Sequence, residues 1–134
     1  MYKRQLLKHK PEFLFEAAQS LSKTGQYEKA NEYLERAVLL SSDPMLYYVM
    51  AKNEQCLGEY RQAEKHLLHA IDILPERIYP YYLLMNLYTE PSYFQPAKLK
   101  MAIDSVLTKK PKVESSAIKE MKEKARSMLN NTSI

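Results

Sequence analysis

The sequence LGEYRQA at residues 57–63 decides how the chain is read, because TGQYEKA at residues 24–30 is an earlier version of it. Gly58 follows Gly25 by 33 residues, and further residues share this offset: Pro11 and Pro44, Ala18 and Ala51, Leu34 and Leu67, Ala37 and Ala70. Self-similarity at a fixed period of this size is typical of arrays in which each repeat is one supersecondary unit.

Each repeated residue type has a physical role in a pair of helices joined by a tight turn. Gly25 and Gly58 follow helical patterns and can adopt the positive φ that ends a helix. The alanines lack bulk, so two helices can approach closely where they occur. Tyr27 and Tyr60 begin the second helix of each pair, and a leucine follows on the same face as the alanines. The pattern therefore predicts an all-α chain.

On these residues the chain resembles the tetratricopeptide repeat (TPR) family. The second repeat fits the family's order of a small residue, Gly, an aromatic, Ala, a large apolar residue, Ala and a closing Pro, in Ala51, Gly58, Tyr60, Ala63, Leu67, Ala70 and Pro75. The first repeat differs at Leu34, where an aromatic is common, and at Ser42, where the closing Pro would fall. The resemblance implies a TPR-type α-solenoid of about three helix–turn–helix repeats plus a C-terminal capping helix.

The expected organisation follows from this period. It comprises a basic N-terminal segment 1–10, repeats 11–43, 44–77 and 78–110, a capping helix 111–129 and a frayed tail 130–134. Within the first two repeats, helices are expected at 11–23, 27–40, 44–57 and 60–74. Residues 1–5 resemble translated sequencing-adapter read-through, so the N-terminal segment is either native or an artefact of a fragmentary reading frame.

The third repeat keeps the helical pattern but loses the family's residues. Ala97 follows Ala63 at nearly the right distance, yet Asp104 stands where the next alanine would be, and residues 90–96 carry two prolines instead of the glycine. The apolar stripe of the following helix therefore has a shifted phase. A last helix should start at Ser115 or Ser116, either of which could cap it.

Composition bounds the function classes. The 134 residues are 46% hydrophobic, no apolar run approaches the ~20 residues of a membrane span, and the single Cys56 is read as a small apolar filler. Net charge is −5 over residues 11–97 and +5 over residues 98–134. Basic ends can bind phosphates, but no nucleic-acid motif accompanies them, so no nucleic-acid partner is expected.

No catalytic or cofactor motif is found: the sequence has no phosphate-binding loop, no metal-spaced cysteines and no nucleophile elbow. His66, His69 and Asp72 lie three residues apart on one helix and are read either as metal ligands or, preferably, as polar residues of a solvated face. The sequence predicts no cofactor, no metal and no enzyme activity for this segment.

A TPR array presents a concave face built by the first helix of each repeat. Mapped through the resemblance, the partner-binding groove contains Phe15, Gln19, Met45, Tyr48, Lys52, Tyr79, Tyr82 and Asn86. Aromatic residues stand where the TPR proteins that clamp a C-terminal carboxylate have charges, which argues against such a clamp. The expected occupant is a protein or peptide segment, possibly helical; a neighbouring helix of a longer chain or the last helix is the alternative occupant.

A narrower resemblance covers residues 77–129. RIYPYYLL at 77–84 and VLTKKPKVESSAIKEM at 106–121 are similar to the C-terminal TPR tail of O-antigen ligase or polymerase-like membrane proteins of Bacteroidetes. Two hypotheses follow: a self-standing interaction scaffold, or the soluble accessory end of a membrane glycan transferase whose catalytic part is absent here. The domain would then be cytoplasmic or tethered to a membrane only through a longer chain, and its partner could belong to that chain.

Overall fold

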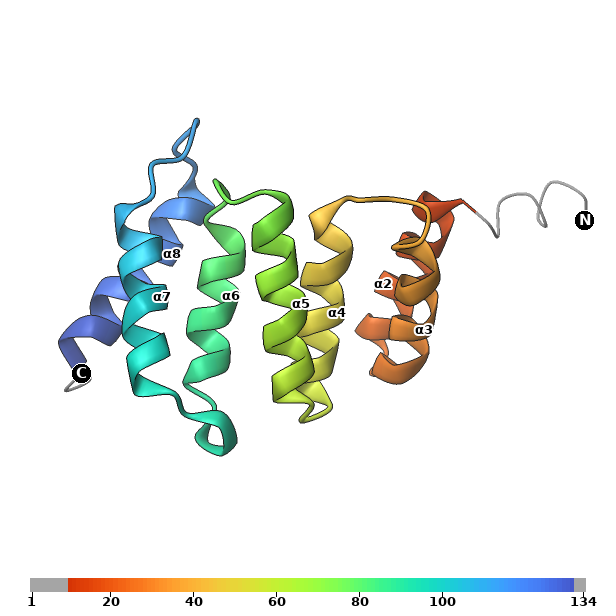
Figure 1. Ribbon diagram of the computed structural model, residues 1–134, viewed down its shortest axis with the longest axis horizontal. Helices are drawn as coiled ribbons and strands as arrows, with labels where there is room; N and C mark the ends of the chain where they lie inside the picture. The colour runs from red at the N-terminus through yellow and green to blue at the C-terminus, as the bar shows by residue number, and fades with distance from the viewer. Residues whose placement is uncertain (1–9, 132–134) are drawn as a thin grey trace, which may run out of the picture. The chain divides into compact units, whose positions relative to one another are not determined.

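The computed structural model describes residues 10–131 (Figure 1), and over that range the all-α prediction is confirmed, with helices and no strand. Seven α-helices and one short 3-10 helix (η1) occupy it: α2 (Pro11–Lys23), α3 (Tyr27–Ala37), α4 (Pro44–Cys56), α5 (Tyr60–Ile73), α6 (Tyr79–Tyr88), η1 (Pro91–Tyr93), α7 (Pro96–Thr108) and α8 (Ser116–Asn131). Residues 1–9 and 132–134 lie outside the described residues, and with them most of the expected basic segment and part of the expected frayed tail.

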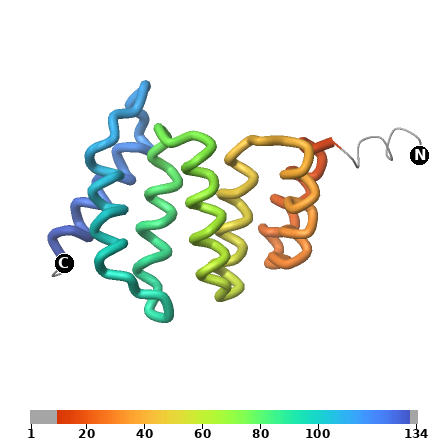
Figure 2. Tube along the Cα trace, viewed as in Figure 1, coloured from red at the N-terminus to blue at the C-terminus, as the bar shows by residue number. Residues whose placement is uncertain are grey.

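The chain divides into two compact units after Ile73, and each is described by itself. The first unit contains two helical hairpins, α2 with α3 and α4 with α5 (Figure 2). The bounds of α4 follow those of α2 by 33 residues at both ends, and α5 begins 33 residues after α3. The period seen in the sequence is therefore also the period of the helices in this unit.

Both hairpins turn through the predicted glycines. Gly25 has φ 82° and Gly58 has φ 78°, and no other residue of the described range has a positive φ. After Gly25, the Gln26 amide donates to the Leu21 carbonyl at 2.9 Å; after Gly58, the Glu59 amide donates to the Glu54 carbonyl at 2.8 Å. This six-to-one hydrogen bond is that of a Schellman motif, which satisfies carbonyls that the helix end leaves without partners.

The repeated alanines and leucines form the core of the first unit. Fully buried side chains on α3 and α5 come from equivalent positions of the two repeats: Ala30, Leu34 and Ala37 on α3, and Ala63, Leu67 and Ala70 on α5. Small side chains at these positions leave no bulk between the helices, so the paired backbones pack closely. This confirms the role predicted for the alanines.

Helix α3 is shorter than predicted, since it ends at Ala37 and not at Leu40. The amides of Leu39 and Leu40 bond to the carbonyls of Arg36 and Ala37, which is the i to i−3 spacing of a tightened turn. Leu39 is 82% exposed, so no burial of its side chain favours a further α-helical turn.

Cys56 is another difference between prediction and structure. It is exposed, whereas the sequence reading made it an apolar filler. A side-chain hydrogen bond with Cys56 raises the pKa of Tyr27 above its ordinary value, so this cysteine has a polar contact that links the end of α4 to the start of α3.

The second unit packs α6 against α7 and α7 against α8. On α7 the buried side chains are Leu99, Ala102, Ile103 and Val106, whereas Ala97 and Asp104 are exposed. The phase of the buried stripe has therefore shifted from that of α5, as the sequence predicts. The Ser115 hydroxyl accepts a hydrogen bond from the Ile118 amide at 3.2 Å and caps α8.

Replacing either turn glycine with alanine should destabilise the first unit. A left-handed backbone costs an L-residue about 1–2 kcal/mol. Nothing lies within 4 Å of an added Cβ at either position, so this backbone strain is the whole expected cost. We expect Gly25→Ala and Gly58→Ala each to lower the free energy of unfolding by about that amount in urea denaturation.

Lys65→Ala on the exposed face of α5 is the control, and it should change the free energy of unfolding by less than about 0.5 kcal/mol. Unchanged stability in both glycine variants would contradict the assigned role of the turns.

Candidate functional site

The predicted groove residues divide between the two units. In the first, Phe15 and Gln19 belong to α2, and Met45, Tyr48 and Lys52 belong to α4. Gln19 and Lys52 are exposed, Phe15 is half-buried and Met45 is 44% exposed. Tyr48 is only 5% exposed, so its ring offers little surface to a partner. The residues available for contact on this face are therefore Phe15, Gln19, Met45 and Lys52.

Local structure holds this face in place. Asp43 caps α4, because its carboxylate accepts a hydrogen bond from the Met45 amide at 3.0 Å. A hollow of about 270 Å³ adjoins Phe15 and is bounded by the start of α2, the Ser41–Asp43 linker and Leu46. Phe15 also packs on the core of the first unit. The face thus combines a fixed aromatic ring with a nearby recess.

In the second unit, the predicted residues Tyr79, Tyr82 and Asn86 lie on α6. The rings of Tyr79 and Tyr82 stack with centroids 6.4 Å apart. Lys124 of α8 places its ammonium 5.5 Å from the centroid of the Tyr82 ring, so the last helix contacts part of this face. The Asn86 side-chain oxygen is buried and has no hydrogen-bond partner among the described residues.

Further contacts fasten α8 and the segment before it within the second unit. Lys109 lies 5.0 Å from the centroid of the Tyr81 ring, and Lys122 donates to the Lys109 carbonyl at 3.0 Å. Cation–π contacts of this kind are worth about 0.5–1 kcal/mol at exposed sites. Basic residues that the sequence reading took as a solvated face therefore contact aromatic rings of α6.

The structure also reveals a hollow that the sequence reading missed. We call it the furrow: a depression of about 660 Å³ in the first unit, with walls from α3 and the start of α5 and a floor from α4. Its lining residues are Glu28, Asn31, Glu35 and Val38 of α3, Tyr47, Met50 and Glu54 of α4, and Leu57, Glu59, Gln62 and His66 further along the chain.

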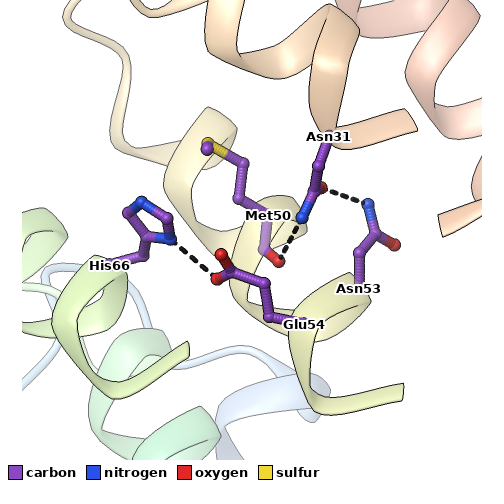
Figure 3. A network of polar contacts seen from close by, with 5 residues as sticks. All are labelled: Asn31, Met50, Asn53, Glu54 and His66. Atoms are coloured by element: carbon purple, nitrogen blue, oxygen red, sulfur yellow. Dashed lines mark hydrogen bonds and ion pairs between the residues drawn. The ribbon is translucent and has the colours of Figure 1, made fainter. Parts of the chain in front are cut away.

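A buried amide network lies beside the furrow (Figure 3). The Asn31 side-chain amide donates to the Met50 carbonyl at 3.3 Å, and the Asn53 amide donates to the Asn31 side-chain oxygen at 2.8 Å. The Ser22 hydroxyl completes the chain by donating to the Asn53 oxygen at 2.8 Å. The network joins α2, α3 and α4, so it fixes the position of the furrow's floor against one wall.

The opposite wall is joined to the floor by an ion-pair contact. His66 Nδ1 lies 2.7 Å from Glu54 Oε1 (Figure 3), and Glu54 is 5% exposed. Because a carboxylate can only accept, the ring nitrogen is the donor. Tyr47 packs beside both histidines of α5, with ring centroids 5.8 Å from His66 and 4.6 Å from His69.

These contacts show what the histidines of α5 do. The sequence placed His66, His69 and Asp72 on one face as metal ligands or as solvated polar residues; in the structure, His66 pairs with Glu54 and His69 packs edge-on against Tyr47. Within residues 10–131, no group of three or more His, Cys, Asp or Glu side chains could hold a metal ion.

One sequence signal could have indicated the buried polar groups. Asn31 and Glu64 are separated by the repeat period of 33, and each follows one of the repeated alanines. Both are buried, at 8% exposure each. Polar residues recurring next to a core position predict a buried polar position, but the partners themselves come from other helices and no local pattern reveals them.

Loss of the Asn31 amide should destabilise the first unit, because the Met50 carbonyl and the Asn53 amide would lose a partner. An unsatisfied buried polar group costs about 1–3 kcal/mol. We expect Asn31→Ala to lower the free energy of unfolding by that amount, and the Asn31→Ala/Asn53→Ala double variant to lose less than the sum of the single variants.

The control is Glu32→Ala, on the exposed side of the same helix, which should be close to neutral in the same denaturation experiment. Strict additivity of the two asparagine variants would contradict the network.

Comparison with known proteins gives one match. Residues 11–44, which comprise α2, α3 and the first residue of α4, match the tetratricopeptide repeat family. No curated protein matches the chain. None of the helices formed by residues 10–131 is long and apolar enough to cross a membrane. Repeats of this family generally mediate protein–protein interaction and are typically non-catalytic. The match and the all-helical architecture together support a TPR protein.

Proposed function

We propose that this chain is a non-catalytic scaffold that binds a peptide or helix of a partner protein on the α2–α4 face, the surface of Phe15, Gln19, Met45 and Lys52. The observation that carries the proposal is Met45, an apolar side chain that is 44% exposed on a helix whose start is fixed by the Asp43 cap. An ordered, exposed apolar side chain beside an aromatic ring is the usual anchor point of a protein interface.

Helical spacing supports this choice of residues. Phe15 and Gln19 are four apart on α2, and Met45 and Lys52 are seven apart on α4, so each pair lies on one side of its helix. Fully burying a Phe or Met side chain is worth about 1.5–3 kcal/mol. Ordering and association costs offset much of this gain, so we expect affinities near micromolar.

The α6 residues Tyr79, Tyr82 and Asn86 are proposed as a second docking face on the other unit. Lys124 already covers part of Tyr82, so a partner would compete with α8 for that ring. An isolated cation–π contact is weak enough for such competition. We therefore assign the stronger contribution to the α2–α4 face, where Met45 is exposed.

The second candidate function is an accessory domain of a membrane O-antigen ligase or polymerase-like protein. It rests on the resemblance of residues 77–129, which lie in α6, α7 and α8 and their connections. In that case the docking faces would serve the parent chain or its complex. The test is the genomic reading frame: several upstream apolar segments of about 20 residues support this candidate, and a start codon at Met1 with no such segments contradicts it.

A matched pair of surface variants tests the scaffold proposal. A peptide is first selected on the wild-type chain from a random displayed library, and its affinity is then measured by fluorescence anisotropy. Met45→Glu should weaken binding about tenfold or more, because the partner's apolar side chain would meet a charge whose burial is costly.

Leu68→Glu is the control, since Leu68 is 47% exposed on α5 and the substitution is equally polar. It should leave the affinity within about twofold of the wild type, a difference of roughly 0.4 kcal/mol. Equal losses in the two variants, or selection of no peptide at all, would count against the α2–α4 face.

A further inference from the structure

We propose that the furrow is a second, separate binding surface, and that its occupant is an extended segment of a partner protein carrying Arg or Lys side chains. The furrow belongs entirely to the first unit, and its residues are all different from those of the α2–α4 face. On α4, Met45 and Tyr47 are two positions apart, which turns their side chains about 200° from each other around the helix. The two surfaces therefore lie on opposite sides of α4.

The shape of the furrow suits a short extended segment. Its floor follows α4 from Tyr47 to Leu57, ten residues along the chain, and a helix rises 1.5 Å per residue, so the floor is about 15 Å long. An extended peptide covers about 3.3 Å per residue. Four or five residues of a partner therefore fit along it, with side chains alternating between the floor and solvent.

The charge of the furrow selects a cationic occupant. Its lining includes four glutamates, Glu28, Glu35, Glu54 and Glu59, and no Lys or Arg. The neighbouring Arg36 instead lies 5.7 Å from the centroid of the Tyr33 ring, outside the lining. The whole chain carries a net charge of +4, so the furrow's charge is opposite to that of the molecule. Carboxylates on facing walls of a depression reinforce each other's potential.

The furrow also has surfaces for the aliphatic and planar parts of basic side chains. Val38, Met50 and Leu57 provide apolar contact for the methylene stem of a Lys or Arg. The Tyr47 ring, held by its packing against His66 and His69, can stack with a guanidinium group. Charge and shape are thus combined with an ordered aromatic ring, which a merely solvated acidic surface does not have.

Glu54 is the residue most firmly set in this surface. It is almost fully buried, and His66 donates to only one of its oxygens through a 2.7 Å contact. A carboxylate has about four acceptor positions, so Glu54 can accept a further hydrogen bond from an incoming cation. The amide network of Asn31 and Asn53 holds the adjoining wall, so the acceptors are in place before the partner binds.

The probe for this proposal is a fluorescein-labelled penta-arginine peptide, titrated with the wild-type chain at low salt. The test variant is Glu35→Gln/Glu59→Gln, which removes one exposed carboxylate from each wall and keeps the side-chain shape. We expect this variant to bind about fivefold more weakly, since each exposed ion pair contributes modestly. Affinity of the wild type should fall with added salt.

The control variant is Glu32→Gln/Glu120→Gln, which changes the net charge equally at exposed positions outside the furrow. It should keep the wild-type affinity within about twofold, and so should Met45→Ala on the α2–α4 face. Equal weakening in the two glutamate variants would show unspecific attraction and overturn the proposal, as would the absence of binding. Loss of binding in Met45→Ala would place the peptide on the α2–α4 face instead.

Sedimentation velocity separates the remaining occupant, a second copy of this chain. The basic residues of 98–134 could enter the furrow of another molecule, since that region carries a net charge of +5. A wild-type dimer that the Glu35→Gln/Glu59→Gln variant dissociates would overturn the proposal of a partner segment. A monomeric wild type that binds penta-arginine, with amide NMR shifts confined to residues 28–38 and 59–66, would support it.

Discussion

The constraint on which the first unit depends is the left-handed backbone at Gly25 and Gly58. Each glycine reverses the chain within a few residues, and the hydrogen bonds that follow it satisfy the end of the preceding helix. The reversal brings the alanines of the paired helices face to face, where their small size permits close packing. Without the turn, Ala30 and Ala63 would have no neighbouring helix against which to be buried.

The sequence could predict these hairpins because everything that forms them is local. A glycine, a proline at the start of α2 and α4, and alanines at helical spacing all act within one period of the chain. The third pair shows the limit of the same reasoning: Asp104 signals that α7 has lost the repeat pattern, but the contacts of Lys109 and Lys124 with tyrosines of α6 depend on how three segments pack.

The binding surfaces were less predictable for the same physical reason. The family resemblance assigned Tyr48 to a groove, but the ring is buried, because a position on the exposed side of an isolated helix can be covered when helices pack. Glu54 and His66 are twelve residues apart, and Asn31 and Asn53 are 22 apart, so no periodic pattern within one helix relates them. Only the recurrence of polar residues at positions 31 and 64 gave a signal.

Helix α4 has two different chemical surfaces, and the core explains how both are kept. Asn53 and Glu54 are adjacent on this helix and both buried, and each is tied to a different neighbour, Asn53 to α3 and Glu54 to α5. A buried polar residue without its partner costs more than its hydrogen bond contributes, so either bond would resist rotation of α4. Since rotation would exchange Met45 for Tyr47 at the α2–α4 face, the same two bonds keep apolar and acidic surfaces on separate sides of one helix.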